Sequence, residues 1–362
     1  MISGMIIGVG FFALPYIAAQ VGLSVMLACL FVLTAIVIII HQYYAEVALQ
    51  TPDFLRLPSY AGIYLGKSGK IITLVISIIG FSGTLLAYIV IGGEFLSGLL
   101  APIFGGGQFI YAFIYFAFGA LIIFFGVKTV SKFEFLDSVL FAVILLAVFW
   151  FGRNYFNFSN INFIDNLKNG AKDLFLPYGP ILFALWGGAN IISEVEEIIA
   201  PNKQILKKVV AWSIILPAIF YLIFILVVVG ISGAKTSQEA IAGLQGILHP
   251  GIINLLLIFG LVATFTSFIA CGLILRNIFR YDLKINKHYS WAIACAIPFV
   301  LYLAGFKDFI KIIGFIGATT LAVKGILIIL MYRKIKKVNF LPIILIAFLF
   351  LGIIYEIYYF VR

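Results

Sequence analysis

The chain has 362 residues, of which 64% are hydrophobic and 10% are charged, and its formal net charge is +10. Soluble domains carry about 45–50% apolar and about 25% charged residues, so this composition excludes an ordinary soluble domain. The basic residues fall in short loops between apolar runs, which indicates membrane topology and argues against nucleic-acid binding.

Eleven apolar runs follow one another along the chain, at about 1–19, 22–48, 70–99, 108–127, 133–152, 175–199, 205–232, 251–276, 289–304, 309–331 and 340–361. Most of them approach or exceed the length of about 20 residues that a helix needs to cross a bilayer. We therefore predict an all-α polytopic membrane protein with about eleven transmembrane helices.

Lysine and arginine gather in the loops after the second, fourth, sixth, eighth and tenth runs. Short loops enriched in these residues stay in the cytoplasm. The sequence thus predicts a multi-pass integral protein of the plasma (inner) membrane, with a cytoplasmic N-terminus. With eleven spans the C-terminus lies outside.

The first run contains an unusual cluster of helix-disfavouring residues, namely Gly4, Gly8, Gly10 and Pro15. Each interior glycine costs a helix about 1 kcal/mol relative to alanine, and proline removes a backbone donor. Unwound backbone at mid-membrane is tolerated where it lines a protein-enclosed cavity. The cluster therefore predicts a broken helix. The alternative is close helix packing through the Gly4-x-x-x-Gly8 pair.

The sixth run carries adjacent glycines, Gly187 and Gly188, followed by a polar and acidic half. Two glycine-interrupted segments in corresponding positions of two halves indicate an inverted-repeat transporter. Because five spans is an odd number, the second half starts from the opposite side. We predict a transporter core over 1–331, with repeats at about 1–152 and 175–331, and an accessory helix at 340–361.

Four stretches, at 8–16, 59–70, 183–187 and 266–268, resemble motifs of the amino acid/auxin permease and aromatic amino acid permease families. Both belong to the amino acid–polyamine–organocation (APC) superfamily. The resemblance implies a LeuT-like fold, with a five-plus-five inverted repeat, broken first and sixth helices and an accessory eleventh helix. It also implies ion- or proton-coupled movement of amino acids.

A pair of broken helices can bind both charged groups of an amino acid. The free amides at Val9 and Gly10 are expected to donate to its carboxylate, and the carbonyls of Ile6 and of 183–186 to accept from its ammonium. Tyr88 is expected to cap the site, and its alternative role is ordinary packing, as it is for the aromatic residues of the sixth run. The predicted substrate-binding residues are Ile6, Gly8, Val9, Gly10, Tyr88, Phe183, Ala184, Trp186, Gly187 and Gly188.

The eighth run offers neutral oxygen ligands for a cation. The carbonyl of Ala263 and the hydroxyls of Thr266 and Ser267, together with the carbonyls of Gly4 and Ile7, would form a five-oxygen shell. Such a shell suits Na⁺ and resembles the common sodium site of this fold. The alternative is that the hydroxyls bond back to carbonyls of the preceding helical turn.

Charged residues inside a membrane are costly and are functional candidates by default. Glu94, Glu194 and Glu356 lie within predicted spans, and we take Glu94 and Glu194 as candidate proton relays or gates. Lys324 is the one deep cation, and we expect one of the acids to be its partner.

Enzyme functions lack their chemical groups, because neither an HExxH nor a GxSxG motif is present. We predict a secondary active transporter of amino acids that works by alternating access, without a cofactor and with Na⁺ or H⁺ as coupling ion. Gly187 and Gly188 are expected to leave room for a hydrophobic or aromatic substrate. The alternatives are a channel or substrate sensor on the same scaffold, or a transporter of a polyamine or nucleobase.

Overall fold

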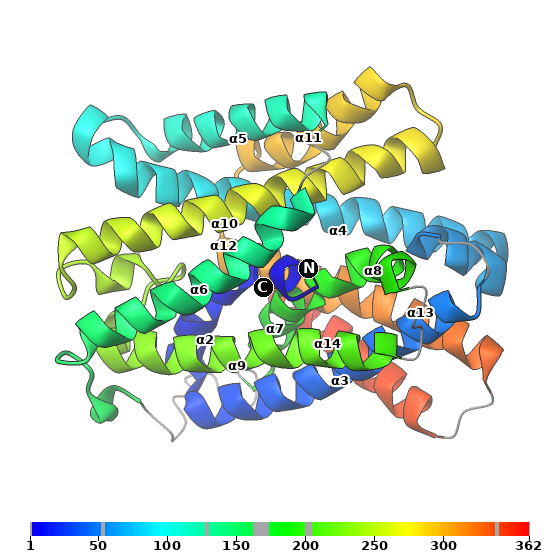
Figure 1. Cartoon of the computed structure of the whole chain (residues 1–362), viewed down its shortest axis with the longest axis horizontal. Coiled ribbons are helices and arrows are strands. Elements are labelled where there is room, and N and C mark those ends of the chain that lie inside the picture. Colours follow the sequence, from blue (N-terminus) through cyan, green and yellow to red (C-terminus); the bar gives the residue numbers. More distant parts are fainter. Residues whose placement is uncertain are drawn as a thin grey trace.

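The computed structural model describes residues 2–51, 55–126, 130–161, 174–199, 205–336 and 340–361. The described residues form helices and connecting turns, with one isolated β-bridge between Gln245 and Leu248. Figure 1 shows long helices running side by side, most of them close to the long axis of the view. The predicted all-α class is confirmed.

The first half of the chain contains three pieces of one broken span and four long helices. These are α1 (Ile2–Ile6), η1 (Val9–Ala13), α2 (Leu14–Val21), α3 (Leu23–Leu49), α4 (Leu57–Phe104), α5 (Gln108–Phe125) and α6 (Val130–Gly152), with the short η2 (Phe158–Asn160) after them.

The second half again begins with a broken span. Its elements are α7 (Tyr178–Leu185), η4 (Trp186–Ile191), α8 (Ile192–Ile199), α9 (Leu206–Ser232), η6 (Gly233–Lys235), η7 (Ala242–Leu244), α10 (Pro250–Asn277), η8 (Ile278–Asp282), α11 (Lys287–Leu303), α12 (Phe309–Phe315), η9 (Ile316–Leu321), α13 (Ala322–Ile335) and α14 (Leu341–Val361).

Each predicted apolar run is helical, and the breaks in the first and sixth runs are confirmed. The third predicted span, at about 70–99, lies within α4, which begins earlier, at Leu57. Its backbone bends sharply at Gly66, where φ is +74°, a left-handed conformation that favours glycine. The segment before Gly66 is a separate piece of helix that precedes the apolar run.

The tenth run contains an interruption that the sequence analysis did not predict. A π-helical segment, η9, lies between α12 and α13, and such segments occur frequently at functional sites. η9 packs closely on α7, and a methyl group on Gly317 would overlap the carbonyl oxygen of Gly179. Gly179 and Gly317 lie in two distant runs, and their close contact could not be seen as a pattern in the sequence.

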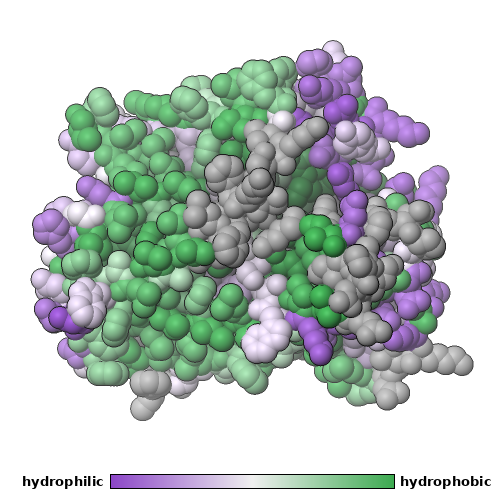
Figure 2. Space-filling view, viewed as in Figure 1, coloured by the Kyte–Doolittle hydropathy of each residue, from purple (hydrophilic) through white to green (hydrophobic). Residues whose placement is uncertain are grey.

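Seven helices of the described residues are long and apolar enough to cross a membrane, and two shorter apolar segments, Val9–Val21 and Val139–Gly152, accompany them. Figure 2 shows a broad apolar band between two polar ends of the molecule. Large apolar side chains such as Phe31 are exposed within the helices, as lipid contact requires. The chain is a multi-pass integral membrane protein, while the count of eleven spans stays a prediction.

The two broken spans meet in the interior of the protein. α1 packs on η4, and α7 packs on η1, so that each break faces the other. α4, α6, α9 and α10 surround them, and Figure 1 shows the N-terminus near the centre of the helix array. This arrangement brings unwound backbone into a protein-enclosed position.

Candidate functional site

The first break lies at Ile7 and Gly8. The Gly8 amide donates to the Ile6 carbonyl oxygen at 2.8 Å, and Gly8 has an extended backbone with φ −113° and ψ −153°. This short-range bond replaces the regular helical bond to the residue four positions earlier. The helix therefore ends at Ile6 and starts again as a 3₁₀ turn at Val9.

Glycine is required where the two broken spans touch. A methyl group on Gly10 would lie 2.8 Å from the Cα of Ala184, and one on Gly187 would overlap the Met5 carbonyl oxygen. Glycines thus permit the break at Gly8 and the close approach at Gly10 and Gly187. The alternative packing through the Gly4-x-x-x-Gly8 pair stays a prediction.

The expectation that Gly187 and Gly188 leave room for a large substrate is wrong. The space beside Gly187 is filled by the backbone at Met5, and the space beside Gly188 by the side chains of Ile2 and Ile6. Neighbouring chain, rather than substrate, occupies the volume that a side chain would need there.

A cavity of about 50 Å³ lies between the two breaks and receives residues from the first, third, sixth, eighth and tenth spans. We call it the central cavity. Its lining residues are Met5, Ile6, Gly8, Val9, Gly10, Gly80, Phe81, Thr84, Tyr88, Phe183, Trp186, Gly187, Ser267, Cys271, Leu321 and Lys324.

Eight of the ten predicted substrate-binding residues line the central cavity, and the remaining two, Ala184 and Gly188, do not. Ala184 lies against Gly10, and Gly188 lies against Ile2 and Ile6. Of the predicted ion ligands only Ser267 lines the cavity.

Tyr88 lies directly against the first break. Its hydroxyl is hydrogen-bonded with the amide of Val9 and with the side chain of Ser267, and a methyl group on Gly8 would lie 2.7 Å from its oxygen. The Val9 amide, predicted to bind a carboxylate, thus already has an acceptor. A carboxylate that binds this amide has to displace the Tyr88 hydroxyl.

Tyr221 of α9 connects both breaks, and sequence reasoning missed it. Its buried hydroxyl lies 2.9 Å from the Ile6 carbonyl oxygen and 3.2 Å from that of Ala184, and it can donate to either. Both carbonyls lie at the ends of broken helices, where the regular intrahelical donors run out. A single tyrosine in an apolar run gives no spacing signal, so only the fold reveals this role.

The hydroxyls proposed for a sodium site point in different directions. The Thr266 hydroxyl lies within hydrogen-bonding distance of the Val262 and Ala263 carbonyls in its own helix, at 3.2 and 3.1 Å, as the alternative interpretation expects. Ser267 instead lies in the wall of the central cavity. Gly4 and Ile7 are buried in the first broken span, which packs mainly on α6, α9 and η4. The sodium site stays a prediction.

Glu94, one of the two acids chosen as proton relays, does not line the central cavity. The Glu94 carboxylate accepts a hydrogen bond from Gln108 at 3.1 Å, near the end of α4 that is remote from Gly80. The side chain of Glu194 lies outside the described residues. Glu356 is buried beside Gly314 of α12.

Lys324 is 3% exposed and lines the central cavity. Its Nζ lies 4.7 Å from the centre of the Phe81 ring, a cation–π distance. Among the described side chains no carboxylate forms an ion pair with it. The expected acidic partner is therefore not found in that part of the chain.

A second cavity, of about 70 Å³, adjoins the central cavity and shares Phe81, Trp186 and Lys324 with it. We call it the inner cavity because Arg56, from a loop predicted to be cytoplasmic, lies in its wall. Its other lining residues are Tyr44, Leu57, Pro58, Ser77, Ala189, Ile274 and Ile278.

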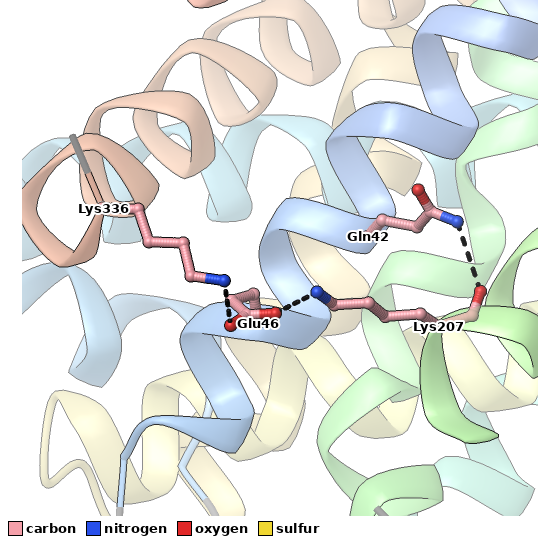
Figure 3. Close-up of polar contacts among 4 residues, drawn as sticks. All are labelled: Gln42, Glu46, Lys207 and Lys336. Carbon is pink, nitrogen blue, oxygen red and sulfur yellow. Dashed lines mark hydrogen bonds and ion pairs between the residues drawn. The ribbon is translucent and has the colours of Figure 1, made fainter. Parts of the chain in front are cut away.

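On the same basic side, Glu46 of α3 binds two lysines (Figure 3). Its buried carboxylate pairs with Lys207 at the start of α9 and, at 2.9 Å, with Lys336 at the end of α13. The hydrogen bond to Glu46 raises the pKa of Lys336. Gln42 adds a 3.4 Å bond to the Lys207 carbonyl. This group, the Glu46 cluster, connects three helices at one end of the bundle.

Comparison with known proteins identifies a family and solved structures of similar fold. A model of the tryptophan/tyrosine permease family matches residues 1–342. The structure of Mhp1, a nucleobase-cation-symport-1 family transporter with bromovinylhydantoin bound, has a TM-score of 0.71 at 12% identity, covering 98% of this chain and 89% of that one. The structure of MhsT in complex with L-phenylalanine has a TM-score of 0.58 at 13% identity, covering 97% of each chain. No curated protein matches.

Proposed function

Since the chain belongs to the tryptophan/tyrosine permease family, and is a secondary transporter of amino acids rather than an enzyme, we propose that its substrates are aromatic amino acids. The substrate moves by alternating access, driven by a coupled cation that is Na⁺ or H⁺. The family supports the aromatic class, and so does the bound L-phenylalanine in a transporter of similar fold.

One observation carries the proposal: the two broken spans face each other across a cavity whose wall contains both amides and carbonyls. Amides at a helix break can bind a carboxylate, and carbonyls can bind an ammonium. In this conformation the carboxylate has to displace the Tyr88 hydroxyl from the Val9 amide. A zwitterionic amino acid presents both groups a few ångströms apart. Phe81, Phe183 and Trp186 supply apolar surface for its side chain.

The central cavity is too small for an aromatic amino acid in this conformation. Its volume of about 50 Å³, at about 10–15 Å³ for each water molecule, holds only a few waters. Substrate entry therefore requires the cavity wall to move. We infer that the structure represents a closed state of the transport cycle.

For the membrane arrangement we retain the predicted topology. The N-terminus is cytoplasmic, the C-terminus is outside, and α14 is the accessory eleventh span of a plasma (inner) membrane protein. The basic end of the bundle supports this orientation, because Arg56, Lys207 and Lys336 gather there. The two repeats, at about 1–152 and 175–331, are related by inversion.

Transport by the purified chain in proteoliposomes tests the proposal. Labelled tryptophan should accumulate inside when an inward proton or sodium gradient is imposed, and unlabelled tyrosine and phenylalanine should compete better than alanine, a polyamine or a nucleobase. Gly10→Ala, with its methyl group directed at Ala184, serves as an inactive control. Uptake of none of the twenty amino acids under either gradient would contradict the proposal, and ion currents without saturable substrate dependence would indicate a channel.

A further inference from the structure

Lys324 differs from the other charged side chains described within the spans because it borders two cavities at once. The central and inner cavities have three lining residues in common: Phe81, Trp186 and Lys324. These three side chains form the partition between the two spaces. The ammonium of Lys324 can therefore exchange protons with either cavity as the partition moves.

The partition isolates a positive charge in a costly environment. The Lys324 side chain is almost fully buried, its Nζ faces the Phe81 ring, and no described carboxylate pairs with it. An isolated charge inside a membrane protein is strongly disfavoured unless it is paired or loses its proton. Lysine, unlike arginine, readily gives up its proton when buried.

Few titratable or charged groups face Lys324 from the helices packed on it, and none of those described is an acid that forms an ion pair with it. Glu356 of α14 lies beside Gly314 instead. The nearby groups are Tyr88 and Cys271 in the central cavity, Tyr44 and Arg56 in the inner cavity, and His41, whose ring contacts Trp186.

Lys324 is also separated from the predicted carboxylate site. A methyl group on Gly80 would lie 3.7 Å from its Nζ, whereas the hydroxyl of Tyr88 lies at the Gly8 break. Gly80 and Tyr88 are eight residues apart on α4, which corresponds to about 12 Å along a helix. Lys324 therefore lies at the level of α4 where the central cavity adjoins the inner cavity, and the predicted carboxylate site lies at a different level of α4.

We propose that Lys324 carries the coupling proton of the transport cycle, an inference that rests on the proposed amino acid transport. When the partition opens inward, an Nζ–H bond breaks and a water molecule of the inner cavity takes the proton as hydronium. When the central cavity opens to the outside, the neutral amine takes a proton from a hydronium ion there, which leaves a water molecule. One proton thus crosses with each substrate, and no other reactant is needed.

The experiment measures two fluxes in proteoliposomes, with tryptophan as substrate. Counterflow of labelled tryptophan into liposomes loaded with unlabelled tryptophan reports substrate movement without a driving force. A trapped pH indicator reports tryptophan-dependent proton entry. The variants are Lys324→Met, Lys324→Arg and, as a matched control, Lys311→Met, which changes an exposed lysine in the same run.

The wild type and Lys311→Met should show both fluxes. Lys324→Met should retain counterflow, now independent of pH, and its proton entry should fall to the level of protein-free liposomes. Lys324→Arg should lose proton entry as well, because a guanidinium does not release its proton. If Lys324→Met fails to fold, the arginine variant still decides the question.

Proton entry at the wild-type ratio in either Lys324 variant would overturn the proposal. Sodium-driven uptake without proton entry in the wild type would also overturn it, while leaving amino acid transport intact. Loss of counterflow in both variants would assign Lys324 to substrate binding or folding instead. Absence of amino acid counterflow in the wild type would refute the proposed function itself.

Discussion

The substitution Tyr221→Phe tests the most specific feature of the helix breaks. It removes one oxygen atom and leaves the ring, which stacks on Phe11 at a centroid distance of 5.7 Å. Tyr221 is fully buried, so water cannot replace the lost donor. The Ile6 and Ala184 carbonyls would then lose the hydroxyl donor that α9 supplies.

The Ile6 oxygen keeps the Gly8 amide as a donor, whereas the Ala184 oxygen loses the Tyr221 hydroxyl. Leaving a buried acceptor without its donor costs about 1–3 kcal/mol. With an unfolding entropy of about 2.1 cal/mol/K per residue over 362 residues, this loss lowers the unfolding midpoint by about 1–4 °C. The Ile6 carbonyl would at the same time become a freer acceptor for the substrate ammonium. We therefore expect lower stability together with an unchanged or lower KM for tryptophan.

The assay is thermal unfolding of the purified protein in detergent, followed by uptake in proteoliposomes. Tyr178→Phe is the matched control, because Tyr178 is also buried on a broken span but donates one longer bond, of 3.3 Å, to Leu349. It should lower the midpoint less. If Tyr221→Phe is as stable as the wild type and KM rises, Tyr221 contacts the substrate instead of joining the two breaks, and the reasoning fails.

Four further predictions follow from individual contacts. Gly10→Ala should abolish transport and reduce the yield of monodisperse protein in gel filtration, since its methyl group would lie 2.8 Å from the Ala184 Cα; wild-type yield and uptake would refute the close approach. Tyr88→Phe should tighten tryptophan binding by up to about tenfold, because the substrate no longer has to displace a hydroxyl from the Val9 amide. A tenfold change in Kd corresponds to about 1.4 kcal/mol. Weaker binding in a scintillation proximity assay would make Tyr88 a direct ligand. Glu46→Gln should weaken the cluster that ties α3 to α9 and α13, so that a cysteine introduced as Ser77→Cys, in a background without the three native cysteines, reacts faster with a thiol reagent from the inner side. An unchanged reaction rate would show that the Glu46 cluster does not hold the inner cavity closed. Thr266→Ala should not change uptake in sodium relative to choline buffer, since its hydroxyl bonds within its own helix; a higher sodium requirement would instead support the predicted sodium site.

The sequence by itself determined that most of the chain lies in a lipid bilayer, that it is helical, and where both helix breaks occur. Apolar runs longer than a bilayer is thick leave no other fold for these segments, because unpaired backbone cannot face lipid. Gly8 and Gly187 mark the breaks because each interior glycine weakens a helix locally, whatever surrounds it. These features depend on neighbours along the chain, and the chain alone specifies them.

The tertiary structure decided which groups meet. Tyr221 and Lys324 come from the seventh and tenth runs and reach the central region only when the helices pack. The room expected beside Gly187 proved to be filled by Met5, a residue 182 positions earlier in the chain. The hydroxyls of Thr266 and Ser267, adjacent in sequence, turned to different surroundings because successive residues of a helix point in different directions. Side-chain partners, free volume and the pairing of π-helical η9 with α7 depend on contacts between distant segments, and no local pattern in the sequence encodes them.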